Sequence, residues 1–225
     1  MKLDKISEHV WVYPFEERRD RPNLSYIQGK KWNLAVDAGH SDEHLKEFYD
    51  ALKEEGLDLP DITVITHWHW DHTLGMHAVN GLTVANEKTK RYLADLEQKI
   101  KTQGVESFLD FDQSIREEYK GGKPVIVTMP DMIFSGEMML DLGDCMVRIF
   151  QAQAPHTDDS TLIEIPEEGV LFLGDAVCGV FPTWKKDPGL CKKLADTIKK
   201  TNVKYCVSGH WEPLSKDETL TDLVW

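Results

Sequence analysis

The chain concentrates potential metal ligands in one short stretch, residues 66–72. Three histidines and an aspartate fall within six consecutive positions there: His67, His69, Asp71 and His72. Each of these side chains is costly to bury unless a partner compensates it, and a bound metal ion is such a partner. Neutral imidazole and carboxylate are the ligands of zinc and of other borderline divalent metals. The stretch therefore predicts a metal site, against the alternative of a histidine-rich surface loop without an ion.

The residues before this stretch indicate how its side chains are aimed. The apolar run before His67 predicts a buried strand at residues 62–66, so the chain leaves the sheet at that histidine. A loop there aims His67 and His69 at one point, and Asp71 and His72 at a second. Three protein ligands with an open coordination position are typical of catalytic zinc sites. Two adjacent metal ions are therefore one interpretation of the spacing.

The stretch resembles the signature motif of the metallo-β-lactamase superfamily, a group of mostly hydrolytic enzymes. It reads THWHWDH and is followed by Gly75. Four further segments are similar to motifs of that superfamily and occur in the same order: Val36–Gly39, Pro155–Thr157, Leu173–Ala176 and Ser208–His210. The resemblance spans residues 6–214. It implies an α+β fold, a four-layer αβ/βα sandwich of two mixed sheets flanked by helices.

The resemblance also implies a metal content and a set of ligands. Two divalent ions are expected, zinc first, with iron or manganese as alternatives. One ion is expected to bind His67, His69 and His156, the other Asp71, His72 and His210, with Asp175 bridging them. Asp37 is expected to lie outside the ligand set and to orient the histidine loop.

A binuclear centre of this kind implies hydrolysis. Two divalent ions about 3.5–4 Å apart lower the pKa of a shared water, so that a metal-bridging hydroxide exists at neutral pH. Asp71 is the candidate catalytic residue, because one carboxylate oxygen stays free to orient the hydroxide when the other binds metal. The expected substrate is a small ester, thioester or lactone. A phosphodiester is the first alternative.

Three other activities of proteins with this fold fit less well. β-Lactam cleavage is disfavoured, since Asp175 stands where zinc β-lactamases with a single thiolate ligand carry cysteine, and since His72 is not in their ligand set. Glyoxalase II shares the ligands, but residues 211–225 leave no room for its glutathione-binding helical region. A di-iron oxidoreductase is a hypothesis from another class, but such proteins carry glutamate in place of His69.

Composition and charge narrow the remaining choices. The chain has 225 residues, of which 41% are hydrophobic, so we expect one core and a single domain over residues 1–225. A formal net charge of −13 disfavours nucleic acid as a partner, because phosphate backbones are bound by clusters of Lys and Arg. No apolar run approaches the roughly 18 residues of a membrane span, and residues 1–5 lack the core of a signal peptide. A small-molecule substrate, a cytoplasmic location and no membrane partner are expected, and the oligomeric state is left open.

Several other residues have a weaker interpretation. The four cysteines show no metal-type pairing and are interpreted as core residues: Cys145, Cys178, Cys191 and Cys206. Four tryptophans near ligand positions either wall an apolar pocket or pack the scaffold: Trp68, Trp70, Trp184 and Trp211. The remaining histidines are interpreted as surface or packing residues: His9, His40, His44 and His77.

The first half of the chain is predicted to begin with an antiparallel meander. Its strands are expected at residues 10–13, 24–28 and 34–36. The charged turn at residues 16–21 is expected near the metals, and a helix capped by Ser41 is expected to reach about Glu55. A strand at 82–85 then leads into a helical insertion near residues 86–121, with helical stretches at 86–103 and 105–119. Whether this insertion is a lid over the site or a plain layer on the sheet is left open.

The second half is rich in predicted strands, which indicate a second sheet. They cover residues 125–128, 138–142, 146–150, 161–165 and 170–173, followed by a helix at 190–200, a strand at 204–207 and a helix at 217–225. His156 and Asp175 follow strand ends, as the histidine stretch does. The two halves are therefore expected to face each other across a shared cleft.

Overall fold

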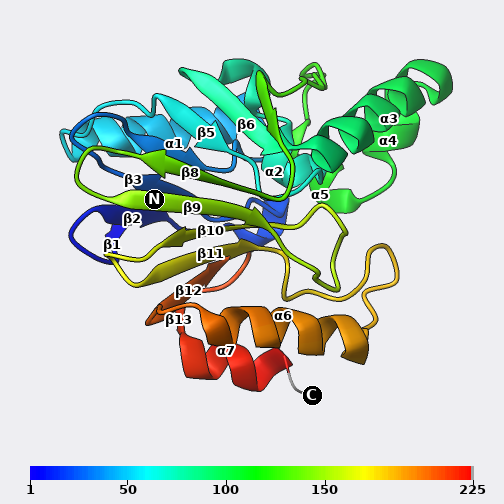
Figure 1. The fold of residues 1–225 in the computed structure, drawn as a ribbon. Coiled ribbons are helices and arrows are strands. Elements are labelled where there is room, and N and C mark those ends of the chain that lie inside the picture. The colour runs from blue at the N-terminus through cyan, green and yellow to red at the C-terminus, as the bar shows by residue number, and fades with distance from the viewer. Residues whose placement is uncertain (224–225) are drawn as a thin grey trace.

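Side chains alternate along strand β2 (Val10–Tyr13) and place it between two apolar layers. Val10 and Val12 pack into the core between two sheets, whereas Trp11 and Tyr13 pack with side chains of helix α1 (Asp42–Glu54). The computed structural model describes residues 1–223. It shows two sheets lying face to face with helices on both outer sides (Figure 1).

Each sheet combines parallel and antiparallel neighbours. The first has seven strands in the order β1 (Asp4–Lys5), β2, β3 (Leu24–Ile27), β4 (Leu34–Val36), β5 (Ile62–Val64), β6 (Leu82–Asn86) and β7 (Met132–Phe134). The second has six in the order β13 (Leu214–Ser215), β12 (Tyr205–Ser208), β11 (Val170–Gly174), β10 (Thr161–Ile165), β9 (Met146–Gln151) and β8 (Glu137–Asp141). Pairing is parallel from β4 to β7 and between β11 and β12, and antiparallel elsewhere. Both sheets are mixed, as predicted.

Helices bury the outer face of each sheet. α1 and α3 (Glu87–Gln103) pack on the first sheet, and α6 (Pro188–Lys200) and α7 (Lys216–Leu223) pack on the second. The layer order is αβ/βα, which confirms the predicted fold class. The helix predicted at 217–225 is observed as far as Leu223, and residues 224 and 225 lie outside the described part. None of the helices within residues 1–223 is long and apolar enough to cross a membrane.

Short helices lie in the segments between the longer elements: η1 (Glu17–Arg19), α2 (Trp70–Thr73), η2 (Met76–Ala78), α4 (Val105–Leu109) and α5 (Gln113–Glu118). The helical stretch predicted at 105–119 is observed as these last two helices, with a break at residues 110–112 that the sequence analysis did not predict. The side chain of Asp112 accepts a hydrogen bond from the backbone N–H of Ser114 and starts a new helix there.

The strand predicted at 125–128 is also wrong, because these residues have no ladder partner within residues 1–223. Val125 and Val127 instead pack their side chains against the helical insertion. The chain joins the first sheet a few residues later, as β7. Asp131 accepts hydrogen bonds from the backbone N–H and the hydroxyl of Thr83, which holds this segment beside β6.

A buried ion pair ties the insertion to the turn after β2. Arg21 is fully buried, and its guanidinium donates to both carboxylate oxygens of Glu118 at 2.8 and 2.7 Å. Glu47 on α1 accepts a third hydrogen bond from Arg21 at 3.0 Å. Burial opposes the charge of Glu118, but hydrogen bonds from Arg21 and Ser41 outweigh it and lower the pKa of that carboxyl. The pair therefore holds α5, α1 and the turn in one arrangement.

Removal of the guanidinium should strongly destabilise the protein. We expect Arg21→Met to lower the free energy of unfolding by about 3–5 kcal/mol, because it leaves the Glu118 carboxylate buried without its partner. Arg116→Met is the matched control, since Arg116 pairs with Glu106 and Asp110 at the exposed surface. It should cost about 1 kcal/mol or less. Urea unfolding of both variants checks the prediction, and equal losses would contradict it.

Candidate metal centre

The candidate ligands lie where strands of both sheets end at one side of the sandwich. The histidine stretch follows β5, Asp175 directly follows β11, and His210 lies two residues after β12. His156 lies in the loop between β9 and β10. The fold thus brings together all seven residues expected from the sequence, and it brings them together as two groups.

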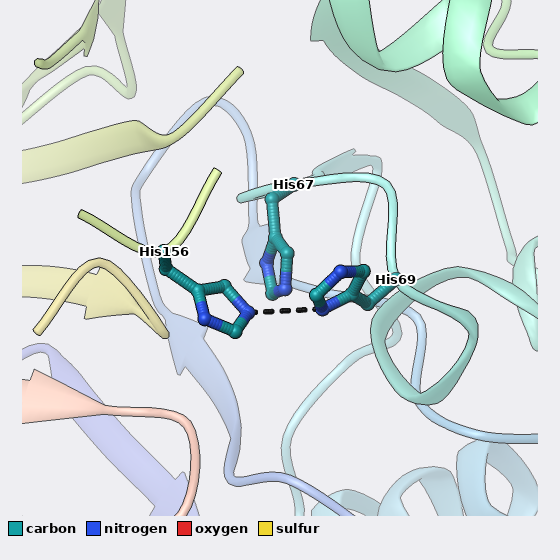
Figure 2. A group of neighbouring side chains, drawn as sticks. All are labelled: His67, His69 and His156. Carbon is teal, nitrogen blue, oxygen red and sulfur yellow. Dashed lines mark hydrogen bonds between the residues drawn. The ribbon is translucent and has the colours of Figure 1, made fainter. Parts of the chain in front are cut away.

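The first group consists of His67, His69 and His156, all buried. One ligand atom from each lies within 4.8 Å of the others. Figure 2 shows the three imidazoles turned toward a common point, with His156 Nε2 at 2.9 Å from His69 Nδ1. They come from the loops after β5 and β9, which belong to different sheets.

The second group consists of Asp71, His72, Asp175 and His210, whose ligand atoms also lie within 4.8 Å of one another. Asp71 Oδ2 is 3.1 Å from both His72 Nε2 and His210 Nε2. Asp175 Oδ1 is 3.4 Å from His72 Nε2, and Asp175 Oδ2 is 3.7 Å from His156 Nε2 in the first group. The Asp175 carboxylate therefore lies between the two groups.

The first group fits a divalent metal ion by its donor atoms. Among residues 1–223, the buried His67 Nε2 has no hydrogen-bond partner, and His69 turns its Nδ1 toward His156 Nε2. Burial lowers the pKa of His67 well below its usual range and that of His69 to about 3, so both imidazoles are neutral. A neutral imidazole with a free nitrogen lone pair is the ligand form of histidine.

The second group carries complementary charges. Burial opposes ionisation throughout, but Asp71, Asp37 and Asp175 outweigh it and hold the pKa of His72 well above its usual range. The pKa of His210 is raised in the same way, chiefly by Asp175. The two histidines in turn hold the pKa values of Asp71 and Asp175 low despite burial. Oxygen and nitrogen donors are therefore paired through protons here. A divalent cation fits the same donors in place of those protons.

Residues behind the ligands fix their orientation. Asp37 Oδ2 accepts a hydrogen bond from His72 Nδ1 at 2.7 Å, and its other oxygen accepts from the backbone N–H of Thr66 at 2.7 Å. His156 Nδ1 lies 3.0 Å from the carbonyl oxygen of Gly179. Each contact leaves Nε2 of the histidine facing the centre. Asp37 lies outside both groups and contacts the histidine loop, as the sequence predicted.

Asp20 is a residue of the site that the sequence did not single out. It follows η1 in the left-handed conformation, with φ of 49°, and its Oδ1 lies 3.4 Å from His210 Nδ1. Burial and then the charge of Asp71 raise its pKa to about 6. The expectation that the charged turn at 16–21 lies near the centre is confirmed. Nothing in the sequence distinguished Asp20 from the other acids of that turn, because its role depends on the neighbouring buried Arg21.

A cavity of about 570 Å³ opens at the second group and includes Asp71, Asp175 and His210 in its lining. Trp184 and Trp211 also line it and are about half exposed, so these two tryptophans wall a pocket. Trp70 lines it as well, but it is buried and packs in a cluster with Ile115 and Tyr119 of the insertion. Trp68 does not line this cavity but lines two other cavities nearby.

Other sequence interpretations concern packing. Cys145, Cys191 and Cys206 are buried and all four cysteines are free, as expected, while Cys178 is half-buried in the cavity wall. The histidines interpreted as surface or packing residues divide between the two roles: His40 and His44 are fully buried, His9 is half-buried and His77 is exposed.

A family model decides the relationship that this geometry suggests. The model of the metallo-beta-lactamase superfamily matches residues 18–210. The chain belongs to this superfamily. The matched region contains all seven candidate ligands. The protein is therefore a hydrolase of that superfamily.

Individual relatives are distant. The chain is 22% identical to acyl-coenzyme A thioesterase MBLAC2 of Homo sapiens and 21% identical to the protein of that name from Bos taurus, covering 89% of this chain and 77% of each relative. A metallo-beta-lactamase from Pontibacter korlensis superposes with a TM-score of 0.71 at 19% identity, over 99% of this chain and 96% of that one. DIM-1 metallo-beta-lactamase superposes with a TM-score of 0.67 at 17% identity, over 99% and 96%. These structural matches show that the fold is shared.

Asp159 anchors the loop that carries His156. Its Oδ2 accepts a hydrogen bond from the Thr89 hydroxyl on α3 at 2.8 Å, and burial raises its pKa from 3.8 to about 6. The folded protein therefore binds more protons than the unfolded chain between about pH 4 and pH 6. Stability conferred at low pH is lost as the pH rises through this window.

Asp159→Asn should remove this loss. The quantity to compare is the free energy of unfolding of the variant minus that of the wild type. We expect this difference to be about 2–3 kcal/mol larger, in favour of the variant, near pH 7.5 than near pH 4. Asp158→Asn is the matched control, because the neighbouring carboxylate is exposed and pairs with Lys88. Denaturant unfolding at the two pH values measures the difference. A difference that does not change with pH would contradict the prediction.

Proposed function

We propose that this protein is a binuclear metal-dependent hydrolase of small acyl substrates, thioesters first, with esters and lactones of the same size as further substrates. The observation that carries the proposal is the pair of buried donor groups joined by Asp175, which contain imidazole and carboxylate but no thiolate. Such hard and borderline donors favour zinc, with manganese or iron as alternatives.

In this proposal His67, His69 and His156 would hold one ion, and Asp71, His72 and His210 would hold the other, with the Asp175 carboxylate available to both. Divalent ions held there would supply an activated water and would polarise the electrophilic oxygen of a substrate. None of the serine or cysteine side chains then needs to act as a nucleophile.

The side chains of the chain itself supply orientation and a dry environment. Asp71 has two carboxylate oxygens, so one is available to accept a proton from a reacting water while the other is engaged. Asp37 and the carbonyl of Gly179 hold His72 and His156 in fixed tautomers. Trp184 and Trp211 give the cavity rim apolar surface, which suits a weakly charged substrate better than a polyanion.

Two observations favour acyl substrates over β-lactams. Asp175 occupies the position between the two groups with a carboxylate, where a thiolate ligand would suit softer coordination. Both curated relatives that match carry the name acyl-coenzyme A thioesterase. The similarity to solved metallo-beta-lactamases supports only the fold, because identity is below 20%.

A substrate panel tests the proposal. Protein reconstituted with zinc or manganese should hydrolyse at least one acyl thioester, ester or lactone with kcat/KM of about 10⁴ M⁻¹s⁻¹ or more. Asp71→Ala should lower this value by about 100-fold or more, whereas Asp95→Ala, at an exposed position of α3, should leave it unchanged. Efficient cleavage of a small aryl phosphodiester or of a β-lactam, with no acyl activity, would show that the proposal is wrong.

A further inference from the structure

The lining of the cavity at the metal centre extends beyond the candidate ligands to the second sheet and its outer helix. Part of its wall is formed by Leu173 at the end of β11, Cys206 on β12, Leu214 on β13 and Thr219 on α7. Cys206 and Thr219 are almost fully buried, at 2% and 4% exposed, yet both line it. We call the part of the cavity that these four residues line the slot; it lies against the second sheet and α7, and its lining is mostly apolar.

The polar groups along this slot are neutral or already bonded. The Thr219 hydroxyl donates to the carbonyl oxygen of Ser215 at 3.1 Å. Burial raises the pKa of the Cys206 thiol, so this thiol stays protonated and presents apolar surface at neutral pH. The slot thus offers little to a charged group and favours the burial of hydrocarbon.

Two polar residues, Lys186 and Asp222, also line the cavity. The Lys186 ammonium donates to the backbone carbonyl oxygen of Asp222 at 2.7 Å, so it already has a partner. Asp71, Asp175 and His210 line the same cavity, so bound ions would lie beside this apolar wall. An apolar wall next to the reacting centre suits a flexible hydrocarbon chain that carries one carbonyl.

We propose that this slot binds the unbranched acyl chain of the substrate and sets its preferred length. The inference rests on the proposed function, because it places the acyl carbon at the metal centre. In the reaction the acyl carbon–sulfur bond breaks and a carbon–oxygen bond forms to the oxygen of water. The products are a carboxylate whose chain lies in the slot, a free thiol and a proton.

A chain-length series tests the slot with one leaving group held constant. Metal-reconstituted protein is assayed with N-acetylcysteamine thioesters of acetate, butyrate, octanoate, dodecanoate and palmitate. We expect kcat/KM to rise by up to about fourfold per added methylene, the equivalent of about 0.8 kcal/mol, until the slot is full, and then to level off or fall. Hydrolysis that is equally fast for all chains, or fastest for acetyl, would overturn the slot but leave the proposed function standing. Failure to hydrolyse any acyl substrate would overturn both.

Two substitutions at Leu214 tie the preference to the slot. Leu214→Trp should lower the ratio of dodecanoyl to butyryl kcat/KM by about tenfold, as expected for the loss of about two buried methylenes, and Leu214→Ala should shift the preferred chain to a longer one. Leu59→Trp is the matched control, because Leu59 is exposed and does not line the cavity. If Leu214→Trp does not fold, the shift in Leu214→Ala decides. An unchanged profile in the Leu214 variants, or an equal change in Leu59→Trp, would overturn the assignment.

Discussion

The structure depends on the compensation of seven ionisable side chains that are gathered in one place and almost all buried. Burying such groups unpaired is unfavourable, so each needs a partner of opposite charge, a hydrogen bond or a metal ion. Asp175 is central to this compensation because its carboxylate lies between the two groups. Gly209 keeps that position accessible, since a Cβ at this residue would lie 2.2 Å from Asp175 Oδ1.

Supports for the centre come from parts of the fold that hold no ligand. The buried pair of Arg21 and Glu118 fixes the turn that carries Asp20, and Asp20 in turn contacts His210. The helical insertion also packs on Trp70, beside Asp71. The helical insertion contains none of the motif residues, yet its contacts help to hold one side of the centre in place. This gives the insertion a positioning role, whether or not it also covers the site.

The sequence predicted most of what is local and chemically dense. His67, His69, Asp71 and His72 are recognisable because packing alone rarely gathers so many ligand side chains within six positions, and all seven expected ligands meet in the structure. The sequence did not predict Asp20, because an acid in a charged turn acquires its role from a long-range ion pair. The strand expected at 125–128 is absent for a related reason. Hydrogen bonds between Asp131 and Thr83, which are far apart in the sequence, place β7 at residues 132–134 instead. The full lining of the cavity was likewise not predictable, because it includes residues of β12, β13 and α7 that belong to no ligand motif.

The central claim is that the two groups of donors hold two separate ions with Asp175 shared between them. Anomalous diffraction at the zinc absorption edge, from crystals grown with excess zinc, measures this most directly. The account predicts two peaks, one within bonding distance of His67, His69 and His156, and one at Asp71, His72 and His210, both in contact with Asp175. A single peak under these conditions, or a second peak away from Asp71 and His210, would contradict it.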